Sequence, residues 1–203
     1  MKILVLDTET LGVAKPRVYD LGWLIYDTTD GTTIVARDYL AKEIFDNKRL
    51  MQTAYYKNKK PLYEKMLADG KCKKVGWAYI CRILSRDINK YKPDGIYAYN
   101  SNFDNRSMKV SCEELKVKNP TADGIIDIWR GIVNPLITKS DGYREFCIAN
   151  GYMSRHKTPR VQENAEVLYR YITGQTDFEE KHMALDDSRI ELEILLHALG
   201  MRA

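Results

Sequence analysis

Two acidic residues stand two positions apart close to the N-terminus. The stretch LDTETLG covers residues 6 to 12 and follows the apolar run KILV, so Asp7 and Glu9 come at the end of an expected buried strand. Strand side chains alternate between the two faces of a sheet, so both carboxylates point the same way. Like charges this close repel each other, and one takes up a proton unless a cation lies between them. The pair therefore indicates either a bound metal ion or a protonated acid.

A third acid, Asp104, follows the apolar stretch IYAYN at residues 96 to 100 and lies near the start of an expected helix. In open α/β sheets, ligands collect at the carboxyl ends of the strands. An aspartate in this place is also a common helix N-cap or first-turn residue. Taken alone, Asp104 fits either role.

The stretch HMALDDSRIELEIL places two neighbouring aspartates, Asp186 and Asp187, in the first turns of the last expected helix, just after His182. The residues three and seven positions after Asp187 are both isoleucines, whereas those after Asp186 are an arginine and a glutamate. Asp187 should therefore lie on the buried face of the helix. A buried carboxylate needs a partner, and a metal ion shared with Asp7 and Glu9 would supply one.

Taken together, the motifs DTETLG, NSNFD and HMALDD resemble, in this order, the three exonuclease motifs of the DEDDh family. That family includes the proofreading exonuclease subunits of DNA polymerases, RNase T and oligoribonuclease, and the resemblance spans residues from about 5 to 190. It implies an RNase H-like fold and five catalytic residues, of which the four acids also bind metal: Asp7, Glu9, Asp104, His182 and Asp187. Leu11, Ser188 and a long basic segment depart from the commoner members, which leaves the choice of substrate open.

The resemblance implies phosphodiester hydrolysis with two divalent metal ions, Mg²⁺ or Mn²⁺, about 3.5 to 4 Å apart. Asp7 would bridge both ions, Glu9 and Asp187 would bind the ion on the side of the attacking water, and Asp104 would bind the other. His182 is the candidate general base, because an imidazole with a pKa near 6.5 accepts a proton at neutral pH. Its position just before the helix predicts that it lies in a loop.

The implied activity is that of a 3′–5′ exonuclease on single-stranded DNA, alone, with a DNA polymerase or as a homodimer, that releases nucleoside 5′-monophosphates. The alternatives are a 3′–5′ exoribonuclease that acts on short RNA or tRNA ends and a non-catalytic nucleic-acid-binding module. Thr10 and Leu11 are placed to contact the terminal nucleotide, with Leu11 either a wedge against the last base or a core residue. Asn100 either holds the strand end or contacts the sugar, and Phe103 either packs in the core or stacks on a base.

The elements that must position these residues form one mixed sheet. Three strand candidates connected by short turns predict an antiparallel meander at residues 2–7, 18–27 and 32–40. Strands at 96–100 and 124–129 alternate with helices, which predicts parallel pairing. Further helices are expected at 75–91, 101–115, 142–151, 161–174 and 183–200. The predicted fold class is α/β, with a mixed five-stranded sheet of three antiparallel meander strands plus two parallel strands, flanked by helices.

Length and composition fit a single exonuclease domain over residues 1–203. Hydrophobic residues make up 44% and charged residues 30%, as in soluble globular proteins. No stretch has the length of a signal peptide or a membrane span, which predicts a cytoplasmic protein without a membrane partner. The four cysteines are too irregularly spaced for a zinc or redox motif.

Positive charge is concentrated in a basic helical segment at about residues 42–92. The net charge of the chain is +4, but this segment carries 14 basic and 5 acidic residues. Such a layout suits a polyanionic partner, although charge runs are also common on solvated surfaces. Within it, AYYKNKKPLY at residues 54 to 63 combines tyrosines with lysines, as tracks for single strands do.

Overall fold

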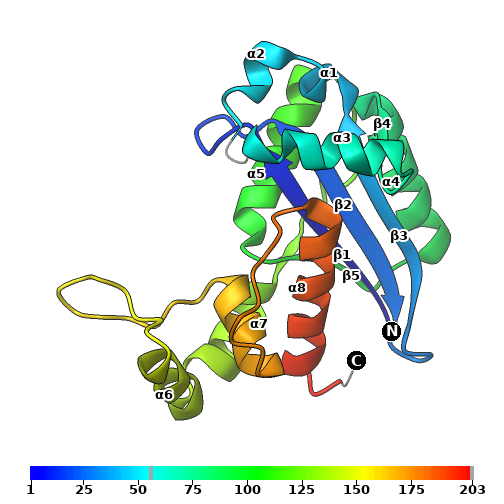
Figure 1. Cartoon of the computed structure of the whole chain (residues 1–203). Coiled ribbons are helices and arrows are strands. Elements are labelled where there is room, and N and C mark those ends of the chain that lie inside the picture. The colour runs from blue at the N-terminus through cyan, green and yellow to red at the C-terminus, as the bar shows by residue number, and fades with distance from the viewer. Residues whose placement is uncertain (55–56, 202–203) are drawn as a thin grey trace.

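In the computed structural model, which describes residues 1–54 and 57–201, a mixed sheet lies at the centre of the molecule (Figure 1). Six strands pair in the order β4-β3-β2-β1-β5-β6. The strands are β1 (Lys2–Thr10), β2 (Val18–Asp27), β3 (Thr32–Ala41), β4 (Lys73–Val75), β5 (Gly95–Ala98) and β6 (Ile126–Asp127). The first three are antiparallel, β5 and β6 continue the sheet parallel to β1, and β4 runs parallel to β3. The meander and both parallel strands are therefore as predicted.

The prediction of five strands is wrong by one, because β4 adds a sixth strand at the edge of the sheet. Its three residues, Lys-Lys-Val, are too few and too polar to show the alternating pattern by which a strand is recognised. Val75, expected in a helix, ends this strand, and the helix starts at Trp77. Pro61 stands in the first turn of α3 (Lys60–Ala68), where its missing N–H is not needed.

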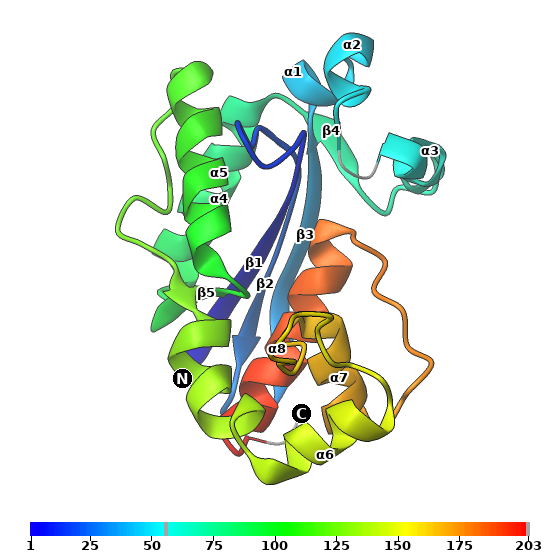
Figure 2. The same cartoon turned by 90° about the vertical axis from the view of Figure 1, so that its left-hand side faces the viewer.

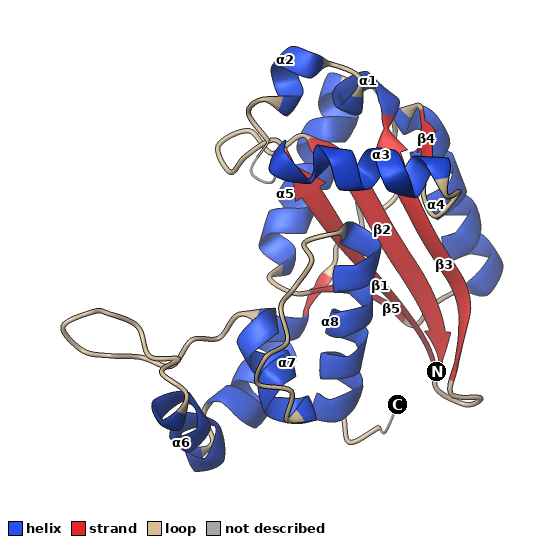
Figure 3. Cartoon of the chain, in the orientation of Figure 1, coloured by secondary structure: helices blue, strands red, loops and turns tan. Residues whose placement is uncertain are grey.

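Helices cover both faces of the sheet and also one end of it (Figures 2 and 3). The longer ones are α3 (Lys60–Ala68), α4 (Trp77–Tyr91), α5 (Ser101–Glu114), α6 (Asp141–Ala149), α7 (Ala165–Thr173) and α8 (Ala184–Ala198). Shorter helical segments are α1 (Lys42–Phe45), α2 (Lys48–Met51) and η1 (Lys57–Lys59), and residues Trp129–Thr138 form the π-helix η2. Figure 2 shows α4 and α5 on one side of the sheet and α7 and α8 on the other.

The two faces of the sheet bury two separate hydrophobic cores. Along β1, Leu4 and Leu6 belong to the core beneath α4 and α5, whereas Ile3 and Val5 belong to the core beneath α7 and α8. This alternation is the period of two expected of a strand that is buried on both sides. All four cysteines are free thiols and are buried. None of the described helices combines the length and the apolar character of a membrane span.

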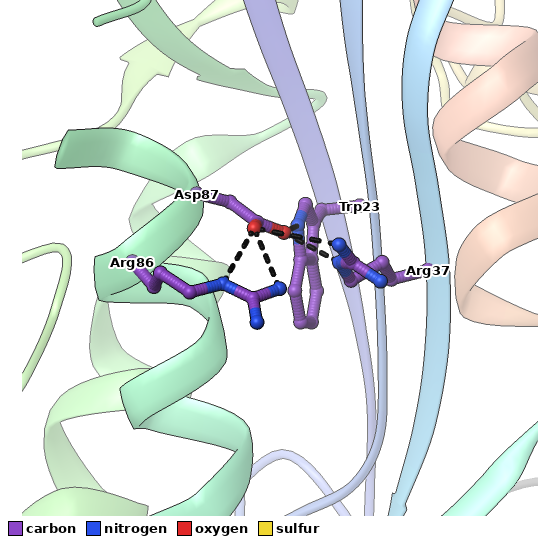
Figure 4. A network of polar contacts seen from close by, with 4 residues as sticks. All are labelled: Trp23, Arg37, Arg86 and Asp87. Carbon is purple, nitrogen blue, oxygen red and sulfur yellow. Dashed lines mark hydrogen bonds and ion pairs between the residues drawn. The ribbon is translucent and has the colours of Figure 1, made fainter. Parts of the chain in front are cut away.

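One buried acid on α4 shows how this chain satisfies a carboxylate that serves the fold. Asp87 is 1% exposed, and Figure 4 shows it between two arginines and an indole. Its Oδ2 accepts hydrogen bonds from Arg37 Nε at 2.5 Å and from Trp23 Nε1 at 3.3 Å, and its Oδ1 accepts from Arg86. Both oxygens therefore have cationic partners, which offset the cost of burying the charge.

Candidate active site

A cavity of about 1200 Å³ collects the residues that the sequence motifs single out. Its lining includes all five predicted catalytic residues, namely Asp7, Glu9, Asp104, His182 and Asp187. They come from β1, from the first turn of α5, and from the start of α8 with the loop before it. The fold thus brings both ends of the chain to one place.

Asp7 and Glu9 lie on one face of β1, as the alternation of strand side chains predicts. Ile3 and Val5, four and two positions earlier than Asp7, belong to the core beneath α8. Asp7 is half-buried and Glu9 is only 6% exposed. Both carboxylates therefore project from the face of the sheet that α8 covers.

Asp104 reaches the same place because β1 and β5 are parallel neighbours, so their carboxyl ends meet at one edge of the sheet. It lies in the first turn of α5 and is 2% exposed. The N-cap residue is Asn100, which has a left-handed backbone with φ of 61°. Asp104 does not cap the helix; its Oδ1 accepts a hydrogen bond of 2.7 Å from Thr8 Oγ1 on β1. Of the two roles open to it, the structure favours the cavity.

The start of α8 is held against β2 by a close approach and two hydrogen bonds. A Cβ atom on Gly22 would lie 2.1 Å from the backbone nitrogen of Leu185, so only glycine fits. Ser188 Oγ donates to the carbonyl of Gly22 at 3.3 Å, and Asp20 Oδ2 accepts from the backbone N–H of Ala184 at 3.2 Å. Because Gly22 pairs with the acidic end of β1, this contact sets where the first turn of α8 meets the acids.

Asp187 lies on the buried side of α8 and Asp186 on the solvent side, as the helix-face argument predicts. Asp187 is 5% exposed. Asp186 is partly exposed and forms ion pairs of 3.1 Å with Lys181 and Arg189. The two neighbours therefore have different surroundings, and only Asp187 lines the cavity.

His182 lies in the loop before α8, as predicted, with a left-handed backbone of φ 53°. Ligand atoms of His182, Glu9 and Asp187 all lie within 4.8 Å of one another. His182 Nδ1 is 3.7 Å from Glu180 Oε2. Burial, helped by the positive charge of Lys59, lowers the pKa of the imidazole, which is therefore neutral at pH 7.

The crowded acids raise one another's pKa values. Burial, followed by the negative charges of Glu191 and Asp104, raises the pKa of Asp7 well above its usual range. Burial and the charge of Asp187 do the same to the pKa of Glu9. Burial and the charge of Glu180 raise the pKa of Asp187 to about 8. The protein alone therefore disfavours ionisation of the whole set at neutral pH.

The donor set fits a divalent cation. Asp187 Oδ1 and Glu191 Oε2 are buried and have no hydrogen-bond partner among the described residues. Buried carboxylate oxygens without partners are costly, and hard cations such as Mg²⁺ and Mn²⁺ are bound by such oxygens. Cations between these acids would favour their ionised forms and remove the repulsion.

The three predicted substrate contacts have different surroundings. Thr10 and Asn100 line the cavity. Leu11 is 6% exposed and belongs to the core beneath α4 and α5, which favours packing over contact with the last base among its two predicted roles. Phe103 lines the cavity. Trp129 also lines it and stacks on Tyr99, with ring centres 6.4 Å apart and planes 14° apart.

The predicted basic segment contributes to the site through Lys59. The Lys59 ammonium donates to the backbone carbonyl of Lys181, in the loop before α8. The segment AYYKNKKPLY was predicted as a track for a single strand, but Tyr55 and Tyr56 lie outside the described residues. That track stays a prediction.

Sequence reasoning missed acids and cations that line the same cavity. Glu191 stands four positions after Asp187 on α8, a spacing that places both on one face of the helix. Glu180 is also part of the lining, and burial with the charge of Glu166 raises its pKa to about 7. Lys157 and Arg160 come from the loop between α6 and α7, the yellow loop that projects in Figure 1.

Comparisons with known proteins found likeness in three dimensions only. No protein-family model and no curated protein sequence matches the chain. The nuclease domain of 3′hExo, a DEDDh family member bound to rAMP, matches with a TM-score of 0.59 at 12% identity over 98% of this chain and 92% of that one. A 3′-exonuclease in a structure on specific recognition of the histone mRNA stem-loop 3′ end matches with a TM-score of 0.58 at 10% identity over 98% and 81%.

Exonuclease I from E. coli, in complex with a 5cy-dA13 oligonucleotide, matches with a TM-score of 0.50 at 14% identity over 96% of this chain. This chain spans 40% of the length of that protein. At such identities the likeness shows the fold. The chain therefore has the RNase H-like fold of the DEDDh-family 3′-exonucleases.

Proposed function

We propose that this protein is a metal-dependent 3′–5′ exonuclease that hydrolyses phosphodiester bonds at the 3′ end of single-stranded DNA and releases nucleoside 5′-monophosphates. One observation carries the proposal, namely that the residues of three motifs line a single cavity in a chain with this fold: Asp7, Glu9, Asp104, His182 and Asp187. A binding module without catalysis has no need of a neutral histidine beside crowded acids.

The four aspartate and glutamate residues of this set would hold two divalent cations, Mg²⁺ or Mn²⁺. When bound, such ions polarise the scissile phosphate, lower the pKa of water and stabilise the leaving 3′ oxygen. Thr8 supports the arrangement by donating to Asp104 Oδ1, which fixes the orientation of that carboxylate. Gly22 and Asp20 support it by seating the first turn of α8, which carries Asp187.

His182 is the proposed general base. Its lowered pKa keeps the imidazole neutral, so a ring nitrogen accepts the proton of the attacking water. Its partly exposed side chain then returns that proton to solvent. The left-handed backbone at His182 turns the loop just before α8, next to Asp187.

The wall of the cavity offers both aromatic faces and cations to a nucleic acid strand. Tyr99 and Trp129 present stacked rings, and bases stack on such rings with little regard to sequence. Lys157 and Arg160 are exposed on the neighbouring loop and would meet phosphates. Thr10 would then contact the terminal nucleotide, with Asn100 nearby at the start of α5.

A second candidate is a 3′–5′ exoribonuclease that acts on short RNA or tRNA ends. It is supported by the two matches with TM-scores of 0.59 and 0.58, whose descriptions name rAMP and an mRNA stem-loop. Discrimination between DNA and RNA must come from contacts to the 2′-hydroxyl, and the same cavity wall would make them.

The test uses single-stranded oligomers of DNA and RNA, labelled at the 5′ end, in Mg²⁺ or Mn²⁺. We expect a ladder that shortens by one nucleotide at a time from the 3′ end, faster for DNA, and no reaction in EDTA. A covalently closed circle of the same DNA sequence is the matched control and should stay intact. Cleavage of the circle, or no degradation of either linear strand, would contradict the proposal.

A further inference from the structure

Three acids of the cavity lining belong to none of the three motifs, Glu163, Glu180 and Glu191, and of these only Glu191 is buried. Glu191 lies one turn after Asp187 on α8 and is 4% exposed. Its side chain lines the cavity together with Asp7 and Asp104. Positions four apart on a helix share a face, so the geometry that aims Asp187 at the site aims Glu191 at it as well.

The Glu191 carboxylate is buried without the donors that this chain gives to Asp87 and Glu163. Its Oε2 atom has no hydrogen-bond partner among residues 1–54 and 57–201. The charged groups that act on it most strongly are themselves acids, Asp104, Asp187 and Glu180. The backbone N–H of Tyr99 is the main polar group that favours its ionised form.

Two other acids show the contrast. Glu163 lines the same cavity, and its carboxylate accepts hydrogen bonds from three side chains, Trp129 Nε1, Asn134 Nδ2 and Thr138 Oγ1, at 3.1 to 3.2 Å. Asp87, buried under α4, is held by two arginines and an indole (Figure 4). The chain supplies side-chain donors to both of these carboxylates, and Glu191 Oε2 has none among the described residues.

We propose that Glu191 is a fifth carboxylate of the metal centre, which holds a divalent cation on the side of Asp7 and Asp104. The inference rests on the proposed function and deepens it. Ligand atoms of Glu9, His182 and Asp187 form a group within 4.8 Å, and Glu191 is outside that group but lines the same cavity as Asp7 and Asp104.

A fifth carboxylate gives this centre one more negative charge than the three motifs supply. A cation between Asp7, Asp104 and Glu191 would meet carboxylates from β1, α5 and α8, so it would bind before any phosphate arrives. We therefore expect the free protein to hold its second ion without nucleic acid.

The test measures Mn²⁺ binding to the full chain without nucleic acid, by electron paramagnetic resonance and titration calorimetry. In Glu191→Gln we expect one of two ions to bind about tenfold more weakly or worse, since even groups that only orient ligands contribute about 10-fold to 100-fold. Glu193→Gln is the matched control on the same helix, because the Glu193 carboxylate accepts a hydrogen bond from Tyr169 Oη and does not line the cavity. This variant should bind Mn²⁺ like the wild type.

A second measurement separates a ligand from a structural residue. In EDTA, the Glu191→Gln variant should melt at a higher temperature than the wild type, because glutamine carries no negative charge for Asp104 and Asp187 to repel. Added Mn²⁺ should raise its melting temperature by less, because the ion stabilises only the state that it binds. Binding and melting curves identical to those of the wild type would overturn the role of Glu191, whereas wild-type protein that degrades no strand would overturn the exonuclease proposal itself.

Discussion

His182 is neutral because burial and Lys59 lower its pKa, and it lies within reach of Glu9 and Asp187. We predict that His182→Gln lowers kcat by about 100-fold to 10,000-fold, the usual contribution of a general base. Mn²⁺ binding should change little, because the carboxylates provide the ligands. His197→Gln, on the exposed end of α8, should keep full activity. An equal loss in both histidine variants would contradict this role.

A buried acid pair outside the cavity predicts how stability depends on pH. Burial, followed by the charge of Asp20, raises the pKa of Asp38 to about 10, while the unfolded group titrates near 4. Because this group takes up a proton on folding, the free energy of unfolding of the protein falls as the pH rises between these two values. In EDTA, Asp38→Asn should therefore gain stability relative to the wild type as the pH rises from 6 to 9. Urea unfolding measures this.

Asp30 provides the control for that experiment, because it lies exposed in the turn between β2 and β3. The stability of Asp30→Asn should follow the wild type at every pH. Unfolding free energies of Asp38→Asn and wild type that differ by a constant amount from pH 6 to pH 9 would contradict the assignment of a raised pKa to Asp38.

The sequence predicted which aspartate of the last motif is buried, because the residues three and seven positions after Asp187 are apolar. It missed Glu191, which stands four positions after Asp187 on the same helix face, where an apolar core residue is usual. An acid at a core position is the signal that finds such a residue. For Leu11, which was predicted as either a wedge or a core residue, the position in the core beneath α4 and α5 favours the second role.

At the scale of elements, Gly22 lets α8 approach β2. Gly22→Ala would place a Cβ atom 2.1 Å from the backbone of Leu185, so the helix must move. We predict a loss of about 1–3 kcal/mol in the free energy of unfolding, as for other overpacked sites, and a lower kcat because Asp187 moves with the helix. Gly131→Ala, which meets open space, should be neutral or slightly stabilising and should retain activity. Equal unfolding free energies of Gly22→Ala and wild type would contradict the close contact.

The loop between α6 and α7 is predicted to bind the phosphates of the nucleic acid. Reversing two charges, Lys157→Glu with Arg160→Glu, should weaken binding of a single-stranded oligomer in Ca²⁺ and reduce the salt slope of log Kd by about two. Lys48→Glu with Lys65→Glu, in the basic segment, is the matched control. A larger effect in the control pair would instead favour the track predicted at residues 54 to 63.

The meander was predictable because β1 to β3 carry long apolar runs with turn residues between them. The edge strand β4 was not, because its pairing with β3 depends on a partner and its own residues carry no pattern. The two aspartates of the last motif predicted where α8 begins. How closely α8 approaches the sheet depends on Gly22, and this contact is visible only in the packed structure. The cationic loop near the acids is likewise a product of tertiary packing, since its residues stand about 150 positions from β1.

At the scale of the whole molecule, the sheet edge where β1 and β5 end gathers negative charge, and cations surround it from other segments. Lys59 approaches from the basic segment, and Lys157 and Arg160 approach from the loop between α6 and α7. A phosphate strand would be attracted by these cations and would meet the acids only where metal ions screen them. The chain covers 92% of the 3′hExo nuclease domain, and partners such as a polymerase or a second copy stay predictions.

The comparison of Asp187→Asn with Asp186→Asn tests the central claim most directly, because the two changes are chemically identical and adjacent. The measurement is the rate of nucleotide release from the 3′ end of a single-stranded oligomer in Mn²⁺, with circular dichroism to check folding. We predict that Asp187→Asn lowers this rate by more than about 100-fold, which is the upper end for groups that only orient metal ligands. The rate of Asp186→Asn should stay within a fewfold of the wild type. Equal losses in the two variants, or an unchanged rate in Asp187→Asn, would contradict the account.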